Sequence, residues 1–391
     1  MKQHRKPNGS TSNFKMFFLR TPLPALWLFL MLMLSPAISF CTEEGRTPAA
    51  DDSAAQTENE KPFQKWAFFP VIASDAQTGL QLGALAIRFI EPSHPDDRTS
   101  TIDFIAFGTT EGQYYAKIQP DIYFTGNKYH LNTLLSGGFW PLNFYGIGND
   151  TPEENETEYE STEYCIRISL ERELVKHAYV GAVGHFESSD VEFENDTRLD
   201  VSNLEGVTGR TKSGLGLVLS FDTRDNVNDP RDGIFIHLGS LFFEESLGSD
   251  QTFQVYHVDM NHYRGIGKNM GIAFRGCIQA TRGEVPFQDL SSPDGSQLLR
   301  GIEAGRYRDR DLVGLQTEFR YPIYKRWGGT FFAETAQVAN EFSDLESSAW
   351  KYSVGAGLRF ALNPSERFNI RLDVSYVDEG LGLVLNIREA F

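Results

Sequence analysis

The segment from Asp311 to Pro322 constrains the fold more than any other, because its side chains alternate strictly between two kinds. One set is mainly apolar and the other is polar or charged: Leu315, Thr317, Phe319 and Tyr321 alternate with Gln316, Glu318 and Arg320. A period of two is typical of a β-strand whose two faces meet different surroundings. A charged inner face is unusual for the core of a soluble protein and typical of the lumen of a transmembrane β-barrel.

Similar alternation recurs along the chain and divides it into sixteen predicted strands. They span residues 64–73, 77–90, 101–110, 113–124, 128–138, 158–172, 177–189, 211–222, 233–245, 252–263, 270–282, 311–321, 327–337, 350–360, 367–376 and 382–390. Bacterial single-chain barrels have an even number of strands, as this count does. We therefore predict an all-β fold, a sixteen-stranded antiparallel transmembrane β-barrel.

The lengths of the connections predict how this barrel is oriented. Connections after odd-numbered strands include the long segments 139–157, 190–210, 283–310 and 338–349, whereas connections after even-numbered strands are mostly short. Bacterial barrels place their long loops outside the cell and their short turns in the periplasm. The pattern therefore predicts that both barrel termini face the periplasm.

Two segments precede the predicted barrel. Residues 1–40 are typical of a secretory signal peptide, because a basic start is followed by an apolar run, Leu26 to Leu34, too short to span a bilayer. Met1 and Met16 are both compatible starting points for it. Residues 41–62 are acidic and small with almost no apolar side chains, so we expect a disordered periplasmic tether. Residues 63–391 then form the barrel.

A loop of four arginines precedes the Asp311 strand and contains the run Leu299, Arg300, Gly301 and Ile302. This run resembles the sixth extracellular loop of the BamA/TamA-like outer-membrane barrels, the bacterial surface antigen family. Three further stretches resemble the same family in the same order. They are the glycine-rich loop 144–149, the periplasmic turn with Asp222, Arg224, Asp225, Pro230 and Gly233, and the penultimate strands around 354–360 and 371–373.

The resemblance implies that the loop folds inward and that Arg300 meets an acidic partner on the barrel wall. Glu334 is the first expected partner and Glu318 the second, since both face the lumen by their place in the alternation. The family usually has an Asp and a glycine where this chain has Glu334 and Ala336. The terminal Phe391 resembles the aromatic assembly signal of outer-membrane barrels, although Glu389 departs from the usual aromatic residue.

The resemblance also implies a function, the insertion or translocation of protein or lipid at the outer membrane. Relatives act through a lateral seam between the first and last strands, which here would join Trp66–Phe69 to Leu383–Phe391. The tether is too short for the family's periplasmic docking domains, so we expect a separate periplasmic partner to supply that role. Other expected partners are outer-membrane lipid, lipopolysaccharide and the machinery that inserts the barrel itself. A plugged passive pore or a structural barrel is the alternative function.

Composition and motifs argue against other classes of protein. A net charge of −17 disfavours nucleic acid, whose phosphates would be repelled. The sequence has no nucleophile motif, phosphate loop, zinc spacing or calcium loop, so we expect neither an enzyme nor a bound cofactor or metal. The histidines are scattered along the chain. Cys165 and Cys277 lie on strands far apart in order, so we expect free thiols.

Overall fold

The computed structural model describes residues 64–75, 79–94, 97–194, 199–267, 269–293, 298–378 and 380–391. The expected signal peptide and the expected tether, including Cys41, lie outside these described residues. None of the helices in the described ranges has both the length and the apolar character needed to cross a membrane.

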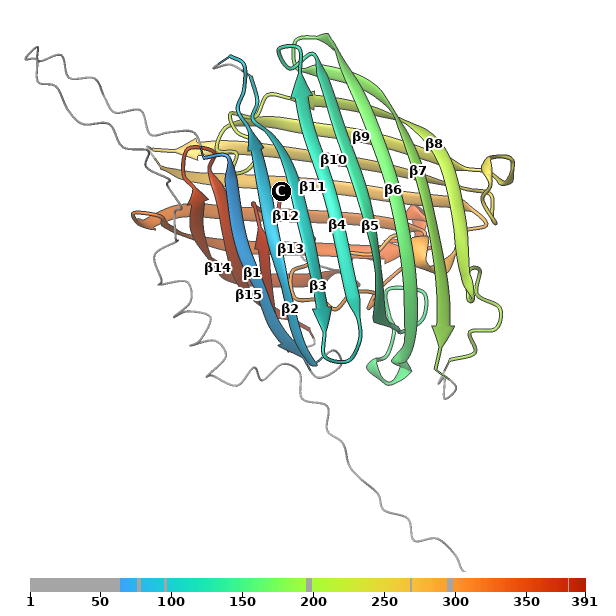
Figure 1. Ribbon diagram of the computed structural model, residues 1–391. Coiled ribbons are helices and arrows are strands. Elements are labelled where there is room, and N and C mark those ends of the chain that lie inside the picture. Colours follow the sequence, from blue (N-terminus) through green and yellow to red (C-terminus); the bar gives the residue numbers. More distant parts are fainter. Residues whose placement is uncertain are drawn as a thin grey trace, which may run out of the picture. The chain divides into compact units, whose positions relative to one another are not determined.

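Within the described residues, sixteen strands form one antiparallel sheet in which each strand pairs with the next along the chain (Figure 1). They are β1 (Trp66–Asp75), β2 (Gly79–Ile90), β3 (Ser100–Thr109), β4 (Tyr114–Phe124), β5 (Tyr129–Phe144), β6 (Thr157–Val175), β7 (Ala178–Phe193), β8 (Gly209–Asp222), β9 (Gly233–Phe243), β10 (Phe253–Ile266), β11 (Met270–Gly283), β12 (Asp311–Tyr324), β13 (Trp327–Ala339), β14 (Lys351–Asn363), β15 (Phe368–Val377) and β16 (Gly380–Ile387). The sequence-based prediction of an all-β fold with sixteen antiparallel strands is confirmed. We call the end of the sheet where β1 begins and β16 ends the terminal end, and the opposite end the far end.

Several strand boundaries differ from the prediction. β5 and β7 run further toward the far end, because pairing continues to Phe144 opposite Thr157 and to Tyr159 opposite Phe193. At the terminal end, β6, β12 and β14 each run three residues beyond the predicted limit. β16 ends at Ile387, three residues earlier than predicted. Arg388 adopts a left-handed backbone conformation with φ of 60°, which ends the strand and turns the last residues away from its line.

The two faces of the sheet differ in chemistry, as the alternation predicts. On β8 the outward side chains of Leu215, Leu217 and Leu219 are exposed, whereas the inward Arg210 and Lys212 are buried. Strands β12 and β15 follow the same rule, with apolar side chains outward and polar or charged ones inward, whereas the inner faces of β1 and β2 are largely apolar. Such a surface suits a membrane outside and a polar lumen inside.

The first and last strands of the sheet meet through apolar side chains at the terminal end (Figure 1). Ile87 and Phe89, on the inner face of β2, are fully buried and belong to one cluster with Leu362 of β14 and Phe368 of β15. The Phe89 and Phe368 rings pack edge to face with their centroids 5.5 Å apart. Partly buried residues from the outward faces of β14, β15 and β16 complete the cluster: Phe360, Ile370 and Ile387. The inner face of β1 and β2 therefore overlaps the outer face of the last strands. We call this overlap the seam.

We predict that placing a charge on the outer face destabilises the barrel. Leu217 lies midway along β8 and its side chain is 61% exposed. Leu217→Arg should lower the free energy of unfolding in lipid by about 2–4 kcal/mol, because a guanidinium would face hydrocarbon. Denaturant titration of the barrel in liposomes measures this change.

Leu247→Arg is the matched control for that measurement, since it makes the same substitution in the short helix Glu245–Leu247 between β9 and β10. We expect it to change the free energy of unfolding by no more than about 0.5 kcal/mol. Equal losses in the two variants would contradict an outer face that contacts lipid.

Candidate functional site

Arg300 lies at the centre of the candidate site, on the loop of residues 284–310 that joins β11 to β12, here called the arginine loop. Its side chain has no exposure to solvent. The Nε atom donates to Glu334 at 2.6 Å, and Nη1 donates to Glu318 at 2.7 Å and to Asp373 at 3.0 Å. The backbone N–H of Arg300 also donates to Glu334, at 2.7 Å. These carboxylates come from β13, β12 and β15, so one side chain ties the loop to three strands.

A wider set of buried charges surrounds this centre. Arg320 and Arg359 both bind Glu318, and Arg359 and Arg371 both bind Asp373. Glu389, beyond the end of β16, accepts a hydrogen bond from Arg359 at 2.7 Å. Removing charges from water is unfavourable unless each meets an opposite charge in good geometry. The network meets that condition, because each arginine in it contacts at least one carboxylate.

The Arg300 guanidinium also lies over the ring of Phe332, with its carbon 3.5 Å from the ring centre. Nη2 is the one polar atom of this side chain for which the described residues supply no hydrogen-bond acceptor. The ring face is negative and attracts a cation, so it occupies the position that an acceptor would otherwise take. Phe332 therefore belongs to the site. Its position on the strand predicts only that it faces the lumen, not that it contacts Arg300.

Gly301 brings the loop backbone against the last strands. Its φ is +91°, and a Cβ built there would lie 2.1 Å from Ser375 Oγ and 2.9 Å from the Cα of Gly382. A side chain at this position would be both strained and obstructed. Gly382 belongs to β16, so the tip of the arginine loop touches the strand that borders the seam.

Apolar residues fix the rest of the arginine loop to the inner wall. Leu299 is fully buried, and Leu298 and Ile302 are nearly so. They share a cluster with Cys277 of β11, Leu312 of β12, and Ala336 and Val338 of β13. The loop is thus held by buried apolar area as well as by charge.

The loop between β5 and β6 forms the second wall of the site. Glu303 of the arginine loop accepts hydrogen bonds from Asn143 at 2.6 Å and from the Tyr145 hydroxyl at 2.9 Å. The backbone N–H of Gly148 donates to the carbonyl of Arg308 at 2.8 Å. The glycine-rich stretch 144–149 and the arginine loop, separated by more than one hundred residues, therefore pack directly together.

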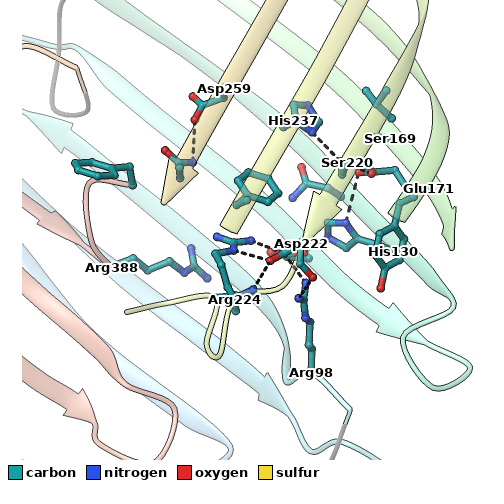
Figure 2. A pocket seen from close by; sticks show the side chains of 18 of the residues that line it. Arg98, His130, Ser169, Glu171, Ser220, Asp222, Arg224, His237, Asp259 and Arg388 are labelled. Atoms are coloured by element: carbon teal, nitrogen blue, oxygen red, sulfur yellow. Dashed lines mark hydrogen bonds and ion pairs between the residues drawn. The ribbon is translucent and has the colours of Figure 1, made fainter. Parts of the chain in front are cut away.

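The turn between β8 and β9 lies at the terminal end of the lumen (Figure 2). Asp222 accepts hydrogen bonds from Arg98 at 2.6 Å and from Arg224 at 2.7 Å. Asp225 accepts from the backbone of Arg231 and from Arg367 of the β14–β15 turn. Burial raises the pKa of the Asp225 carboxyl, but those hydrogen bonds outweigh it and hold the pKa below its usual value. The turn is therefore joined to two other turns across the end of the sheet.

Two further residues of the turn motif contribute through the backbone. The Pro230 carbonyl accepts a hydrogen bond from Arg320 at 3.0 Å. Gly233 has a φ of +111°, and a Cβ there would lie 2.4 Å from the Thr223 carbonyl. The same Arg320 donates to the Phe391 carbonyl at 3.0 Å. The turn, the arginine network and the chain end are thus one connected set of contacts.

A polar cavity of about 500 Å³ lies between this turn and the wall formed by β4 to β11. A run of hydrogen bonds crosses its wall: His130 contacts Asp121 at 2.5 Å, and Ser220 contacts Glu171 at 2.6 Å and His237 at 2.9 Å (Figure 2). The Ser220 hydroxyl donates to Glu171 and also contacts Nδ1 of His237, so Ser220 links the two side chains. Three histidines that are scattered in the sequence, His130, His237 and His257, line this one cavity.

The structure brings together the residues that the sequence placed at the site. Arg300 contacts both Glu334 and Glu318, which the alternation of side chains along their strands predicts on the lumen face. Asp373 was not among the expected partners, although its parity on β15 also places it inside. Phe391, expected as an assembly signal at the end of a strand, instead follows the strand end and contacts Arg320.

Comparison with known proteins adds an independent finding. A family model described as the Omp85 superfamily domain matches residues 103–377. The fold is similar to that of BamA from Haemophilus ducreyi lacking POTRA domains 1–3, with 12% identity and a TM-score of 0.52, covering 83% of this chain and 69% of that one. CdiB from Acinetobacter baumannii matches with 13% identity and a TM-score of 0.49, covering 83% of this chain and 60% of that one. A search of curated proteins finds no match.

We predict that Arg300→Ala strongly destabilises the barrel, because three buried carboxylates would lose a shared cation. The expected loss is about 3–5 kcal/mol in the free energy of unfolding. Urea titration followed by tryptophan fluorescence, with heat-modifiable gel mobility as a check of folding, measures it.

Arg310→Ala is the control, because this arginine of the same loop is only partly buried and makes an exposed hydrogen bond to the Gly283 carbonyl. We expect it to cost less than about 1 kcal/mol. Arg300→Met combined with Glu334→Gln should cost less than the sum of the two single variants, since each single variant leaves a partner unpaired. Additive losses would show that the contact between Arg300 and Glu334 contributes little.

Proposed function

The chain belongs to the Omp85 superfamily, and from that premise we propose that it assists the insertion or translocation of protein or lipid at the outer membrane through its seam. Omp85 barrels such as BamA and CdiB sit in the bacterial outer membrane. We further propose that both termini of the barrel face the periplasm, which puts the long connections outside.

The observation that supports this proposal best is the way the two ends of the sheet meet. Every ladder found among the described residues joins consecutive strands, from β1–β2 to β15–β16, and none of them joins β1 to β16. Among the described residues, the ends are joined instead by the apolar seam and by the ion pair of Arg388 with Asp103 at 2.6 Å. Separating them therefore requires side chains to part rather than a backbone ladder to break.

The membrane around the seam lowers the free energy needed to separate these strands. Inside a membrane, lipid tails are as apolar as the side chains they would replace, so burying Phe360 or Ile370 against β2 has no hydrophobic advantage over contact with lipid. What is lost on opening is close packing, and what is gained is contact with lipid or with an apolar client. A seam of this kind can open toward the bilayer without exposing unpaired apolar groups to water.

The arginine loop is placed to control the seam. Its tip contacts β16 at Gly382, and the Arg300 centre holds β12, β13 and β15 in fixed positions beside it. We propose that this loop keeps the last strands in place while the first strands move. The proposal assigns movement to β1 and β2, whose ladder partners within the described residues are each other and β3.

The alternative function is a passive pore that the arginine loop plugs. The polar cavity of about 500 Å³ inside the lumen favours it over a purely structural barrel. Planar-bilayer recording of a variant lacking residues 284–310 separates these functions, because large conductance would appear only if the loop blocks a pore.

A reversible cross-link across the seam tests the main proposal. Phe89→Cys with Phe368→Cys puts one thiol on each side of the seam, in place of two rings whose centroids lie 5.5 Å apart, in a background with Cys41, Cys165 and Cys277 changed to Ser. We expect joining the two thiols with a bis-maleimide that has a disulfide in its spacer to reproduce the outer-membrane defects of a deletion strain, and reduction of the spacer to restore growth. Growth rate and outer-membrane protein and lipid content are the measurements.

Ile122→Cys with Leu131→Cys is the matched control, because these apolar residues lie directly opposite each other on neighbouring strands β4 and β5 and do not belong to the seam cluster. The same cross-link there ties strands already joined by a ladder and should leave the phenotype unchanged. A locked seam that behaves like the free one, in a strain whose deletion has a defect, would place the function in the lumen or the outer loops.

A further inference from the structure

Three metal-binding side chains converge on the lumen wall at a distance from the arginine site. The Cys165 Sγ and His185 Nε2 atoms are 3.9 Å apart, and His185 Nε2 is 3.2 Å from a Glu187 carboxylate oxygen. Their ligand atoms all lie within 4.8 Å of one another. Among the described residues, this is the one group of three such side chains drawn this close.

Strand register brings the three side chains together. Cys165 on β6 lies directly opposite Glu187 on β7, and His185 precedes Glu187 by two residues on the same face. All three are inward-facing, and Cys165 and Glu187 are buried at 5% and 6% exposure. The ligands therefore sit on two hydrogen-bonded strands rather than on mobile loops, which fixes their spacing.

Charged neighbours orient Glu187. Its Oε1 atom binds Arg210 at 2.5 Å and Lys212 at 3.0 Å, which leaves Oε2 turned toward His185. Asp289 of the arginine loop binds the same two cations and so offsets their charge. A carboxylate held in this way presents one oxygen to a metal while the other is fixed by second-sphere contacts.

We propose that Cys165, His185 and Glu187 form a zinc site. Thiolate, imidazole and carboxylate are the donor types that Zn²⁺ prefers, and three protein ligands leave a fourth position open for water. Binding releases the thiol proton, and the neutral His185 ring binds through Nε2 with its own proton on Nδ1, so one proton leaves as one Zn²⁺ enters. Glu187 also lines a cavity of about 340 Å³ beneath the arginine loop, which gives the ion a route to the site.

Metal titration of the purified, folded barrel in detergent tests the site. We expect Zn²⁺ to bind one equivalent with an affinity that falls at least about ten-fold in Cys165→Ser and in His185→Gln. Co²⁺ provides a direct readout, because a thiolate ligand gives an intense near-ultraviolet charge-transfer band and a tetrahedral site gives strong visible bands. Both should appear in the wild-type barrel and be lost in Cys165→Ser.

Cys277→Ser is the matched control, since Cys277 is the other described free thiol and is equally buried. It should bind Zn²⁺ and give the Co²⁺ thiolate band as the wild type does. Heat-modifiable mobility and circular dichroism of each variant show that it is folded. If a variant does not fold, the Co²⁺ spectrum of the Cys277→Ser barrel still decides the question.

Two results would overturn the proposal. One is a folded Cys277→Ser barrel that shows no Co²⁺ thiolate band, and the other is Zn²⁺ binding that is equal in the wild type and Cys165→Ser. The second result would assign the bound metal to acidic loops instead. Neither result bears on the seam, because none of the three ligands contacts it.

Discussion

The fold depends on the neutralisation of one buried cation. Arg300 has no contact with water, yet it bears a full charge, so its place in the lumen is tolerable only because Glu318, Glu334 and Asp373 surround it. Those acids in turn need Arg320, Arg359 and Arg371, and the network extends to Glu389 at the end of the chain. Because each charge relies on its neighbours, the loop, strands β12 to β15 and the chain end are stabilised together. The first strands lie outside this network, apart from the ion pair of Arg388 with Asp103.

The division between a rigid and a less restrained part of the barrel follows from that arrangement. β12 to β15 are fixed by buried ion pairs, whose removal one at a time is strongly unfavourable. β1 and β2 are held against the last strands mainly by apolar side chains, whose contacts lipid can replace. In such a barrel the most firmly held strands, β12 to β15, lie next to the most weakly held ones, β1 and β2. This contrast is the physical basis on which we assign movement to the seam rather than to the arginine loop.

The sequence predicted those features that depend on local alternation. All sixteen strands and the lumen-facing positions of Glu318 and Glu334 follow from a period of two, because a residue's face is fixed by its parity. Contacts that depend on tertiary register were not predictable. Asp373 has the right parity, but nothing in the sequence says that β15 lies within reach of Arg300. The contact between Cys165 and His185 likewise depends on the register between β6 and β7, since the two residues are twenty positions apart in the sequence. The overlap at the seam depends on the curvature of the whole sheet.

The inward turn at Arg388 has a consequence for how the molecule is made. Ala390 is 5% exposed, Arg320 binds the Phe391 carbonyl and Phe391 is partly buried, so the final residues dock against the lumen wall. Any factor that recognises this chain by its aromatic end has to do so on the extended polypeptide, before the tail docks. For such a factor, docking of the tail against the lumen wall would compete with binding, so its release would accompany the last step of folding. An affinity tag fused after Phe391 would start inside the lumen and compete with that last step.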